Sequence, residues 1–221
     1  MKNNKNCKTI KIRDLGLISY EEGMRIQEEC LLLRQKNDIP DTLLLLEHLP
    51  VYTLGVSATE SDILWDSKKC ENYGIKIVRT SRGGKVTFHG PGQLVGYPVV
   101  RLDGRNRSVV KYITMLEDVL IAVLHTFDIQ GNRDKRNRGV WVGNDKIAAI
   151  GVRISRGVAF HGFALNVNTD LSLYDGIVPC GTRNAGVTSI HKIIQKEMAL
   201  DVVKRIVVEK FIEIFGYDKQ I

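Results

Sequence analysis

Apolar residues fall into two patterns along the chain, one that predicts helices and one that predicts strands. In residues 109–127 the apolar side chains recur every three or four positions, which is the spacing of one face of a helix. Residues 42–48 contain four consecutive leucines, which predict a strand buried on both faces. We expect helices at 20–36, 65–73, 109–127 and 198–215, one helical turn at 170–174, and strands at 9–13, 42–48, 51–54, 75–79, 94–100, 140–142, 146–154 and 158–167.

Two local signals refine these elements. Ser19 and Glu22 have the spacing of a capping box, in which the serine oxygen caps the helix and the glutamate reaches back. Pro98 lies inside the expected strand 94–100 and lacks an amide hydrogen, so it predicts an edge strand or a bulge. Because strands outnumber helices and hairpins alternate with long helices, we expect an α+β fold, a mixed β-sheet with flanking helices. No repeat or linker divides the chain, so residues 1–221 are expected to form a single catalytic domain.

The composition changes this picture through its charge. The chain has 221 residues and a formal net charge of +7, which favours an acidic partner, although most basic clusters are simply solvated faces. No nucleic-acid-binding module accompanies the charge, so nucleic acid is not an expected partner. Two of the clusters consist of Arg101, Arg105, Arg107 and Lys111, and of Arg133, Lys135, Arg136 and Arg138.

The cysteines and histidines limit the chemistry. The four cysteines, at positions 7, 30, 70 and 180, show no C-x-x-C spacing, which is typical of a reducing compartment. The sequence shows no secretory signal and no apolar run of 18 residues, so we expect a cytoplasmic protein with no membrane association. The five histidines are scattered singly, and no metal site is expected.

The segment 82–93 is rich in glycine, with four glycines and one proline. Glycine permits positive φ angles and close approach of the backbone to a ligand, so this segment is expected to bring bare amides and His89 to a cleft. A tight hairpin corner is the simpler alternative. His48, at the end of the strand 42–48, likewise fits either a buried structural histidine or a pocket residue.

Cys180 is the most informative thiol, because Pro179 and Gly181 on either side can hold it at the mouth of a cleft. A thiol with its ordinary pKa of about 8.5 is only roughly 3% thiolate at pH 7, and a nearby ammonium group raises that fraction. Lys146, at the start of the strand 146–154, is the candidate activator. A lysine at a hairpin turn is ordinarily solvated, and sequence spacing does not establish contact with Cys180.

Several motifs together resemble those of the lipoyl (octanoyl) transferases, the octanoyl-[acyl-carrier-protein]:protein N-octanoyltransferase family of lipoate biosynthesis. They are the glycine-rich segment, Lys-Ile-Ala-Ala-Ile-Gly at 146–151, Phe-His-Gly-Phe-Ala-Leu-Asn-Val at 160–167, Val-Pro-Cys-Gly at 178–181 and Gly-Val-Thr-Ser at 186–189. They follow the family's order and cover most of residues 75–190. The two ends of the chain contribute little to the resemblance.

The resemblance implies a biotin/lipoate protein ligase-like fold and transfer of an octanoyl group, with no cofactor of the enzyme's own. The implied donor is octanoyl-acyl carrier protein. The implied acceptors are the lipoyl domains of 2-oxoacid dehydrogenase complexes and the glycine cleavage H protein, and a monomer is expected. In the family the cysteine corresponding to Cys180 carries the acyl group and the lysine corresponding to Lys146 activates it. The residues expected to bind the acyl group are Arg82, Gly83, Gly84, Lys85, Val86, Thr87, Phe88, His89, Ala149, Ile150, Gly151, Gly162, Phe163 and Ala164, with His161 as a candidate polar neighbour.

Two other functions fit parts of this pattern. An ATP-dependent lipoate-protein ligase on the same fold would activate the acid as an adenylate and would need no nucleophilic cysteine, so Cys180 argues against it. A non-catalytic module that binds lipoyl domains or carrier proteins would need neither Lys146 nor Cys180. A nucleic-acid binder is suggested by charge alone.

Overall fold

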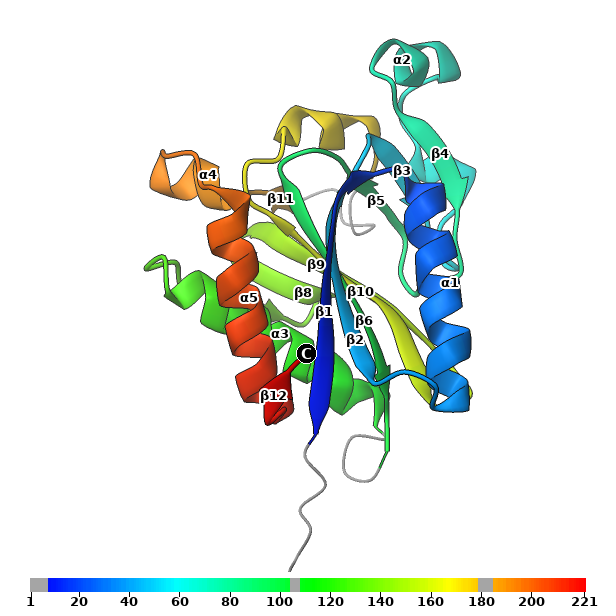
Figure 1. Ribbon diagram of the computed structural model, residues 1–221. Helices are drawn as coiled ribbons and strands as arrows, with labels where there is room; N and C mark the ends of the chain where they lie inside the picture. The colour runs from blue at the N-terminus through cyan, green and yellow to red at the C-terminus, as the bar shows by residue number, and fades with distance from the viewer. Residues whose placement is uncertain (1–7, 104–107, 179–184) are drawn as a thin grey trace, which may run out of the picture.

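A large mixed sheet forms the centre of the protein, shown in Figure 1 as a computed structural model that describes residues 8–103, 108–178 and 185–221. The strands are β1 (Thr9–Ile18), β2 (Asp41–His48), β3 (Val51–Leu54), β4 (Lys76–Arg79), β5 (Val86–His89), β6 (Gln93–Arg101), β7 (Asn132–Asp134), β8 (Asn137–Val142), β9 (Asp145–Ser155), β10 (Val158–Asn166), β11 (Gly186–Val187) and β12 (Lys219–Gln220). The large sheet has the order β12-β1-β2-β6-β10-β9-β8-β7, and β11 pairs with β9. Parallel pairing of β1 with β2 and antiparallel pairing from β2 through β8 make the sheet mixed, as predicted.

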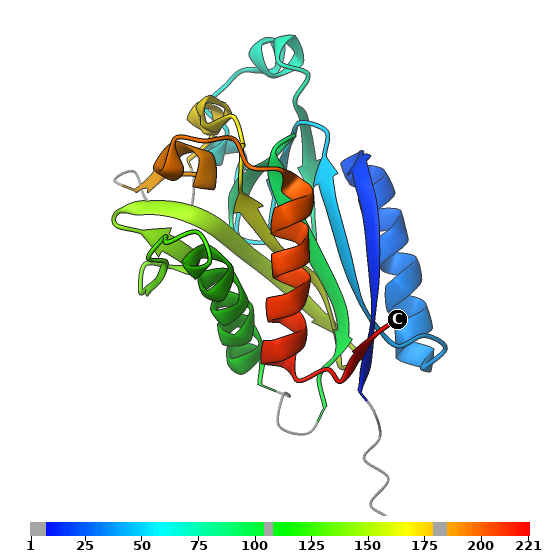
Figure 2. The ribbon, with the colours of Figure 1, turned by 60° about the vertical axis from the view of Figure 1, so that its left-hand side comes forward.

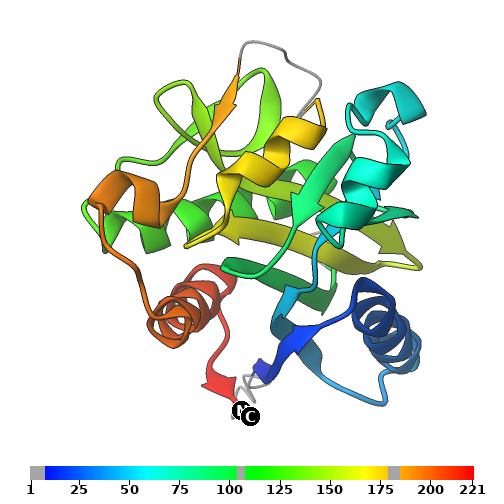
Figure 3. The ribbon, with the colours of Figure 1, turned by 90° about the horizontal axis from the view of Figure 1, so that it is seen from above.

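Long helices cover both faces of this sheet. Helices α3 (Val109–His125) and α5 (Leu200–Phe215) pack on one face, and α1 (Tyr20–Lys36) packs on the other, as Figure 2 and Figure 3 show. The remaining helices are short: α2 (Ser67–Asn72), α4 (Ile190–Ile194), and two 3-10 helices at Glu60–Asp62 and Leu171–Gly176. The predicted α+β arrangement of a mixed sheet between helices is confirmed.

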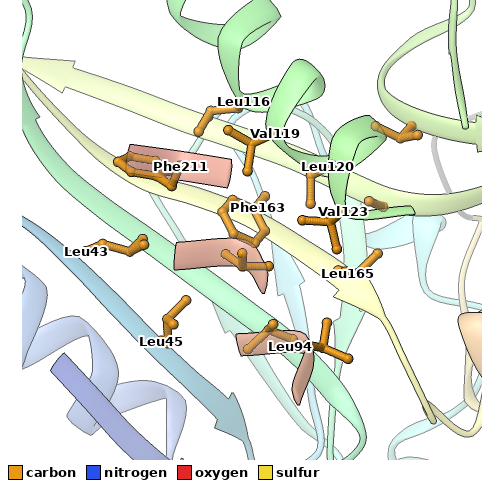
Figure 4. Packing of buried hydrophobic residues seen from close by; sticks show 14 of the residues in the cluster. Leu43, Leu45, Leu94, Leu116, Val119, Leu120, Val123, Phe163, Leu165 and Phe211 are labelled. Carbon is orange, nitrogen blue, oxygen red and sulfur yellow. The ribbon is translucent and has the colours of Figure 1, made fainter. Parts of the chain in front are cut away.

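The leucine run in β2 supplies both cores, as its sequence predicts. Leu43 and Leu45 face α3 and α5, where they pack with Phe163 and Phe211 (Figure 4), whereas Leu44 and Leu46 face α1. All four leucines are at most 2% exposed. Because burial of a leucine side chain contributes roughly 1.5–3 kcal/mol, this strand contributes strongly to the stability of the fold.

Pro98 does not lie on an edge strand. It is in β6, which pairs with β2 on one side and β10 on the other. Pairing of β6 with β10 is interrupted opposite it: Ala159 pairs with Val100 and Phe163 with Gly96, but the three residues from Phe160 to Gly162 have no partner in β6. Since proline has no amide hydrogen to donate, the ladder opens at this point while its register is kept on both sides.

A small three-stranded sheet, in the order β4-β3-β5, stands beside the large one and carries the glycine-rich segment. Strand β5 pairs antiparallel with β3, which orients the glycine turns at both of its ends. Tyr52, Phe88 and Tyr174 pack edge to face in the core of this sheet. The small sheet therefore gives the glycine-rich segment a rigid support.

Several boundaries differ from those expected. The Ser19 hydroxyl caps α1 by accepting from the Glu22 amide, but both oxygens of the Glu22 carboxylate accept from Arg25, so the reciprocal half of the capping box is replaced by an ion pair. Strand β1 extends five residues beyond the expected end at Arg13, because its partner β2 continues to His48.

Within the described part of the chain, no helix has the length and apolar character needed to cross a membrane.

Gly162 should tolerate no side chain. It has a φ of +155°, and an added Cβ would overlap the carbonyl oxygen of Gly96 and lie 2.5 Å from Pro98 Cδ. We expect Gly162→Ala to lower the free energy of unfolding by at least about 3 kcal/mol, measured by urea denaturation. Gly157→Ala is the control: its φ is also positive, at +77°, but the nearest atom to the added Cβ is 4.0 Å away, so a loss of about 1–2 kcal/mol is expected. Equal losses would contradict this account of the strand interruption.

Candidate functional site

A cleft lies between the glycine-rich segment and strands β9 and β10, with the first residue of α1 in its wall. Its volume is about 60 Å³, where one water molecule needs roughly 10–15 Å³, so it is narrow. The residues that line it are Tyr20, Arg82, Gly84, Lys85, Val86, Thr87, His89, Tyr97, Asn137, Lys146, Ala149, Ile150, Gly151, His161, Gly162, Phe163 and Ala164.

Most residues expected at the site therefore lie together in this cleft. Gly83 and Phe88 do not line it, because the Gly83 amide donates to the Val152 carbonyl at 3.1 Å and Phe88 is buried in the core of the small sheet. Cys180 lies outside the described residues. Tyr20, Tyr97 and Asn137 also line the cleft, from α1, β6 and β8, and were not predicted from the sequence.

Lys146 is a buried lysine at one end of the cleft, with only 6% of its surface exposed. Its Nζ lies 5.2 Å from the centre of the Trp141 ring, whose face attracts a cation. A Cβ on Gly139 would lie 2.7 Å from Lys146 Cε, so the glycine of the neighbouring strand leaves the space that the lysine occupies. Lysine is rarely buried, and here the strands β8 and β9 hold it in place.

The segment that contains Cys180 is anchored at both ends by backbone hydrogen bonds. Before it, the Val178 amide donates to the Asp62 carbonyl at 2.9 Å. After it, β11 pairs with β9 so that Val187 lies opposite Lys146, and the Thr188 amide donates to the Lys146 carbonyl at 3.0 Å. The chain thus returns from residues 179–184 directly beside Lys146.

Arg82 fixes the glycine-rich segment to the small sheet. It is 8% exposed, its Nε and Nη2 both donate to Thr53 Oγ1, and Nη2 also donates to the Thr53 carbonyl at 2.6 Å. On the other side of the cleft a Cβ on Gly151 would lie 3.0 Å from the Gly83 carbonyl oxygen. A glycine in β9 therefore allows the segment to approach the large sheet, as close backbone contact requires.

His89 has its tautomer fixed by a buried network. Its Nδ1 lies 2.7 Å from Gln93 Oε1, while Gln93 Nε2 donates to Asn166 Oδ1 and to the Tyr174 hydroxyl. Because the glutamine oxygen accepts, His89 Nδ1 carries the hydrogen and Nε2 keeps its lone pair. Asn166 Nδ2 in turn donates to the Thr188 carbonyl at 3.0 Å, so this network links the glycine-rich segment to the chain that follows Cys180.

His161 lies at the interruption between β6 and β10 and has a left-handed backbone, with φ +59°. In a regular strand its ring would point away from that of Phe160, yet the two rings stack at 4.6 Å on the same side. Its amide donates to Gln27 Oε1 of α1 at 3.0 Å, in place of a bond to β6. The missing ladder pair therefore turns His161 into the cleft.

Tyr20, His48 and Tyr97 form a polar cluster at the end of the cleft where His161 lies. His48 Nδ1 lies 3.3 Å from the Ile18 carbonyl, so Nε2 accepts from the Tyr97 hydroxyl at 2.8 Å. The Tyr20 hydroxyl donates to Thr80 Oγ1 at 3.0 Å. His48 itself is fully buried and does not line the cleft, which supports its structural interpretation. These contacts join α1, β2 and β6, so sequence spacing gave no signal for them.

Burial keeps the rings of this wall neutral. Desolvation lowers the pKa of His48 to about 4 and, together with the positive charges of Arg82 and Arg153, that of His161 to about 3. Desolvation and the neighbouring His48 and Arg82 also lower the pKa of His89 well below its ordinary value. Among residues 8–103, 108–178 and 185–221, no three His, Cys, Asp or Glu side chains come together as metal ligands.

Comparison with known proteins identifies relatives of this chain. The family model described as the lipoyl protein ligase A/B catalytic domain matches residues 19–212. An octanoyltransferase of Alkaliphilus metalliredigens is 44% identical to this chain, over 95% of this chain and 96% of that protein. An octanoyltransferase of Rubrobacter xylanophilus is 47% identical to this chain, over 91% of each.

Solved structures agree on the fold. A bipartite lipoate protein ligase from Thermoplasma acidophilum superimposes with a TM-score of 0.73 at 15% identity, over 97% of this chain and 88% of that one. The biotin protein ligase of Aquifex aeolicus superimposes with a TM-score of 0.54 at 15% identity, over 96% of this chain and 73% of that one. The expected biotin/lipoate protein ligase-like fold is confirmed.

The neutral histidines make stability depend on pH. Because the folded-state pKa values of His48 and His161 lie near 4 and 3, below the ordinary 6.5, the unfolded chain binds more protons between pH 6.5 and 4. The contribution of the neutral histidines to the free energy of unfolding is complete above about pH 6.5. As the pH falls, the free energy of unfolding decreases, by about 3 kcal/mol per histidine at pH 4. Urea denaturation at pH 7, 5.5 and 4 measures it. His48→Gln should flatten the dependence, and the exposed control His125→Gln should not; equal slopes would refute the assignment.

Proposed function

This chain belongs to the lipoyl protein ligase A/B catalytic domain family, and we propose that it carries its acyl group as a thioester on Cys180 beside Lys146. It is an octanoyltransferase, an acyltransferase of lipoate biosynthesis. The donor is octanoyl-acyl carrier protein and the acceptor is a lysine ε-amine of a lipoyl domain. The observation that carries the proposal is the buried Lys146 at the end of the cleft, next to the strand by which the chain returns from Cys180.

The chemistry is two acyl transfers in sequence. The Cys180 thiolate attacks the carbonyl carbon of the octanoyl thioester, and the pantetheine sulfur leaves and takes a proton from the Lys146 ammonium group. The neutral ε-amine of the acceptor lysine then attacks the acyl-cysteine, forms the amide and expels the Cys180 thiolate. The proton lost from the amine returns to Lys146, so the enzyme regains its starting state without ATP.

The cleft supplies the binding energy for the acyl chain. Burial of the six methylenes of an octanoyl group contributes about 5 kcal/mol before the cost of ordering the chain, at about 0.8 kcal/mol each. Ala149 and Ala164 form small apolar walls from β9 and β10, and Gly151 and Gly162 bring the backbone itself close. The chain thus starts near Lys146 and follows β9 inward.

An ATP-dependent ligase is the second candidate, because solved structures with this fold include a lipoate-protein ligase bound with ATP. That likeness has 16% sequence identity and bears on the fold alone. A ligase that forms an adenylate has no use for a cysteine beside a buried lysine. Acyl transfer without ATP therefore separates the two functions.

Cys180 should become acylated when the protein is mixed with octanoyl-acyl carrier protein in the absence of ATP. We expect intact-protein mass spectrometry to show one octanoyl adduct, which Cys180→Ala abolishes together with transfer. Cys70→Ala is the matched control, since Cys70 is buried in α2 with a pKa raised by desolvation, away from the cleft. Lys146→Ala should slow adduct formation by at least about a hundredfold at pH 7, because the thiolate loses its cation. Full turnover by Cys180→Ala would refute covalent transfer.

The basic cluster at 133–138 should dock the acidic carrier. Arg136 lies 4.5 Å from the centre of the Trp141 ring, on which Lys146 also lies, and the exposed Lys135 has no ion-pair partner among the described residues. By contrast, Arg101 is in register with Val158, whose partner Ser155 is nine residues along β9 from Lys146, roughly 30 Å. This places Arg101 of the other basic cluster at the far end of the sheet, while Arg105 and Arg107 lie outside the described residues.

We expect Lys135→Glu to raise the KM for octanoyl-acyl carrier protein about two- to fivefold, with kcat unchanged. Lys111→Glu makes the same charge change at an exposed position near the start of α3 and should leave KM unaltered. Raising the salt concentration from 0.1 M to 1 M shortens the Debye length from about 10 Å to about 3 Å and should remove the difference. Identical KM values for both variants at low salt would place carrier docking elsewhere.

A further inference from the structure

The inner end of the cleft, away from Lys146, is polar. Val152, the register partner of His161, lies six positions beyond Lys146 along β9, a distance of roughly 20 Å along the strand. An extended octanoyl chain spans about 8 Å, since three bonds of an extended backbone span about 3.5 Å. The Lys146 side chain covers part of this distance, because a Cβ on Gly139, the register partner of Ala149, would lie 3.3 Å from Lys146 Nζ. Ala149 and Val152 are three positions apart, roughly 10 Å, so an acyl group bound beside Lys146 Nζ ends close to the level of the His161 ring.

His161 presents an unused hydrogen-bonding atom at this end. It is 1% exposed, and its Nδ1 is buried with no partner among the described residues. Its Nε2 lies 3.4 Å from Ser81 Oγ, and either atom can be the donor. Nδ1 is therefore a lone-pair acceptor in one tautomer and an N–H donor in the other. A hydroxyl group, which both donates and accepts, can pair with either.

The surrounding hydroxyl groups are already committed as donors. Tyr97 donates to His48 and Tyr20 donates to Thr80, which leaves lone pairs on both oxygens. His89 donates through Nδ1 to Gln93, which leaves the Nε2 lone pair. The inner end thus combines several acceptors with the open Nδ1 of His161, whereas the middle of the cleft is formed by Ala149, Ala164 and backbone glycine.

We propose that this inner end is a hydrogen-bonding subsite for the distal end of the acyl chain, centred on His161 Nδ1. The proposal rests on the proposed octanoyl transfer and names its substrate class: medium-chain acyl groups, with a terminal hydroxyl accepted and further alkyl length rejected. The terminal methyl group of a longer alkyl chain would pack against His161 Nδ1 and leave this buried atom without a hydrogen-bond partner. The free-energy cost of that unsatisfied atom corresponds to a preference of about tenfold or more for a chain that ends in a hydroxyl group.

A matched pair of substrates tests the subsite. Nonanoyl and 8-hydroxyoctanoyl chains have the same length and differ by a methyl group in place of a hydroxyl. An equimolar mixture of the two acyl-acyl carrier proteins is presented to the enzyme, and the acyl groups loaded on it are released with hydroxylamine and separated by chromatography. Because both substrates compete for the same folded molecules, the ratio is independent of the fraction of a variant that folds.

We expect the wild type to load 8-hydroxyoctanoyl at least as well as nonanoyl. His161→Phe keeps a ring next to Phe160 but removes the nitrogen atoms, and should shift the ratio about tenfold toward nonanoyl. His161→Asn suits the left-handed backbone and keeps a donor and an acceptor, so it should retain the preference for the hydroxyl. The exposed control His125→Phe should leave the ratio unchanged.

The outcomes separate this subsite from the reaction itself. Normal loading of octanoyl, with a wild-type preference for nonanoyl that neither His161 variant changes, would overturn the subsite and leave the octanoyltransferase function standing. If His161→Phe does not fold, the ratio of the two acyl groups loaded on the wild type and on His161→Asn decides whether the subsite exists. No loading of octanoyl on the wild type from its carrier protein would overturn the proposed function, and the subsite with it.

Discussion

The cleft depends on one missing hydrogen-bond donor in the middle of the large sheet. Pro98 cannot donate across the β6–β10 ladder, and the residues from Phe160 to Gly162 are left without partners in β6 while the pairing continues on both sides. The backbone amide of His161 is satisfied from outside the sheet, by Gln27 of α1. An unsatisfied buried amide would cost about 1–3 kcal/mol, so the helix and the interruption require each other.

This arrangement gives the cleft two chemically different ends. At one end Lys146 is a buried cation on the Trp141 ring, beside the strand that follows the Cys180 segment. At the other end burial and the nearby charge of Arg82 keep the rings of His89 and His161 neutral, and burial raises the pKa of Tyr20. Between them lie alanine and glycine backbone. In the proposed function this polarity would orient the acyl group, with its reactive carbonyl at the charged end.

The same fold in lipoate and biotin protein ligases shows that the architecture does not determine the chemistry. A mixed sheet with a glycine-rich segment beside it makes a narrow groove that suits an acyl chain. In the proposed mechanism the activation step comes from residues at the mouth of that groove. In that proposal they are a thiol and a lysine, which would accept an acyl group already activated as a thioester and would need no nucleotide.

The sequence by itself determined those features that follow from local pattern. Four consecutive leucines required a strand between two cores, Ser19 capped α1, and the spacing of motifs from residue 82 to residue 189 indicated the family and most residues of the cleft. These properties depend on the alternation of apolar and polar residues, on helical spacing and on backbone freedom, and each of these is determined by a few neighbouring residues.

The tertiary structure alone decided the interior place of Pro98, the direction of the His161 ring and the presence of Tyr20 and Tyr97 in the wall. In sequence, a proline in a strand indicates an edge or a bulge, and strand alternation alone would direct His161 to the face opposite Phe160. The interior position and the turned ring are compatible with a stable sheet because Gln27, 134 residues away in sequence, accepts the hydrogen bond that the ladder lacks. Which distant side chain satisfies a buried backbone group is settled by packing of the whole chain, since no local pattern encodes the partner.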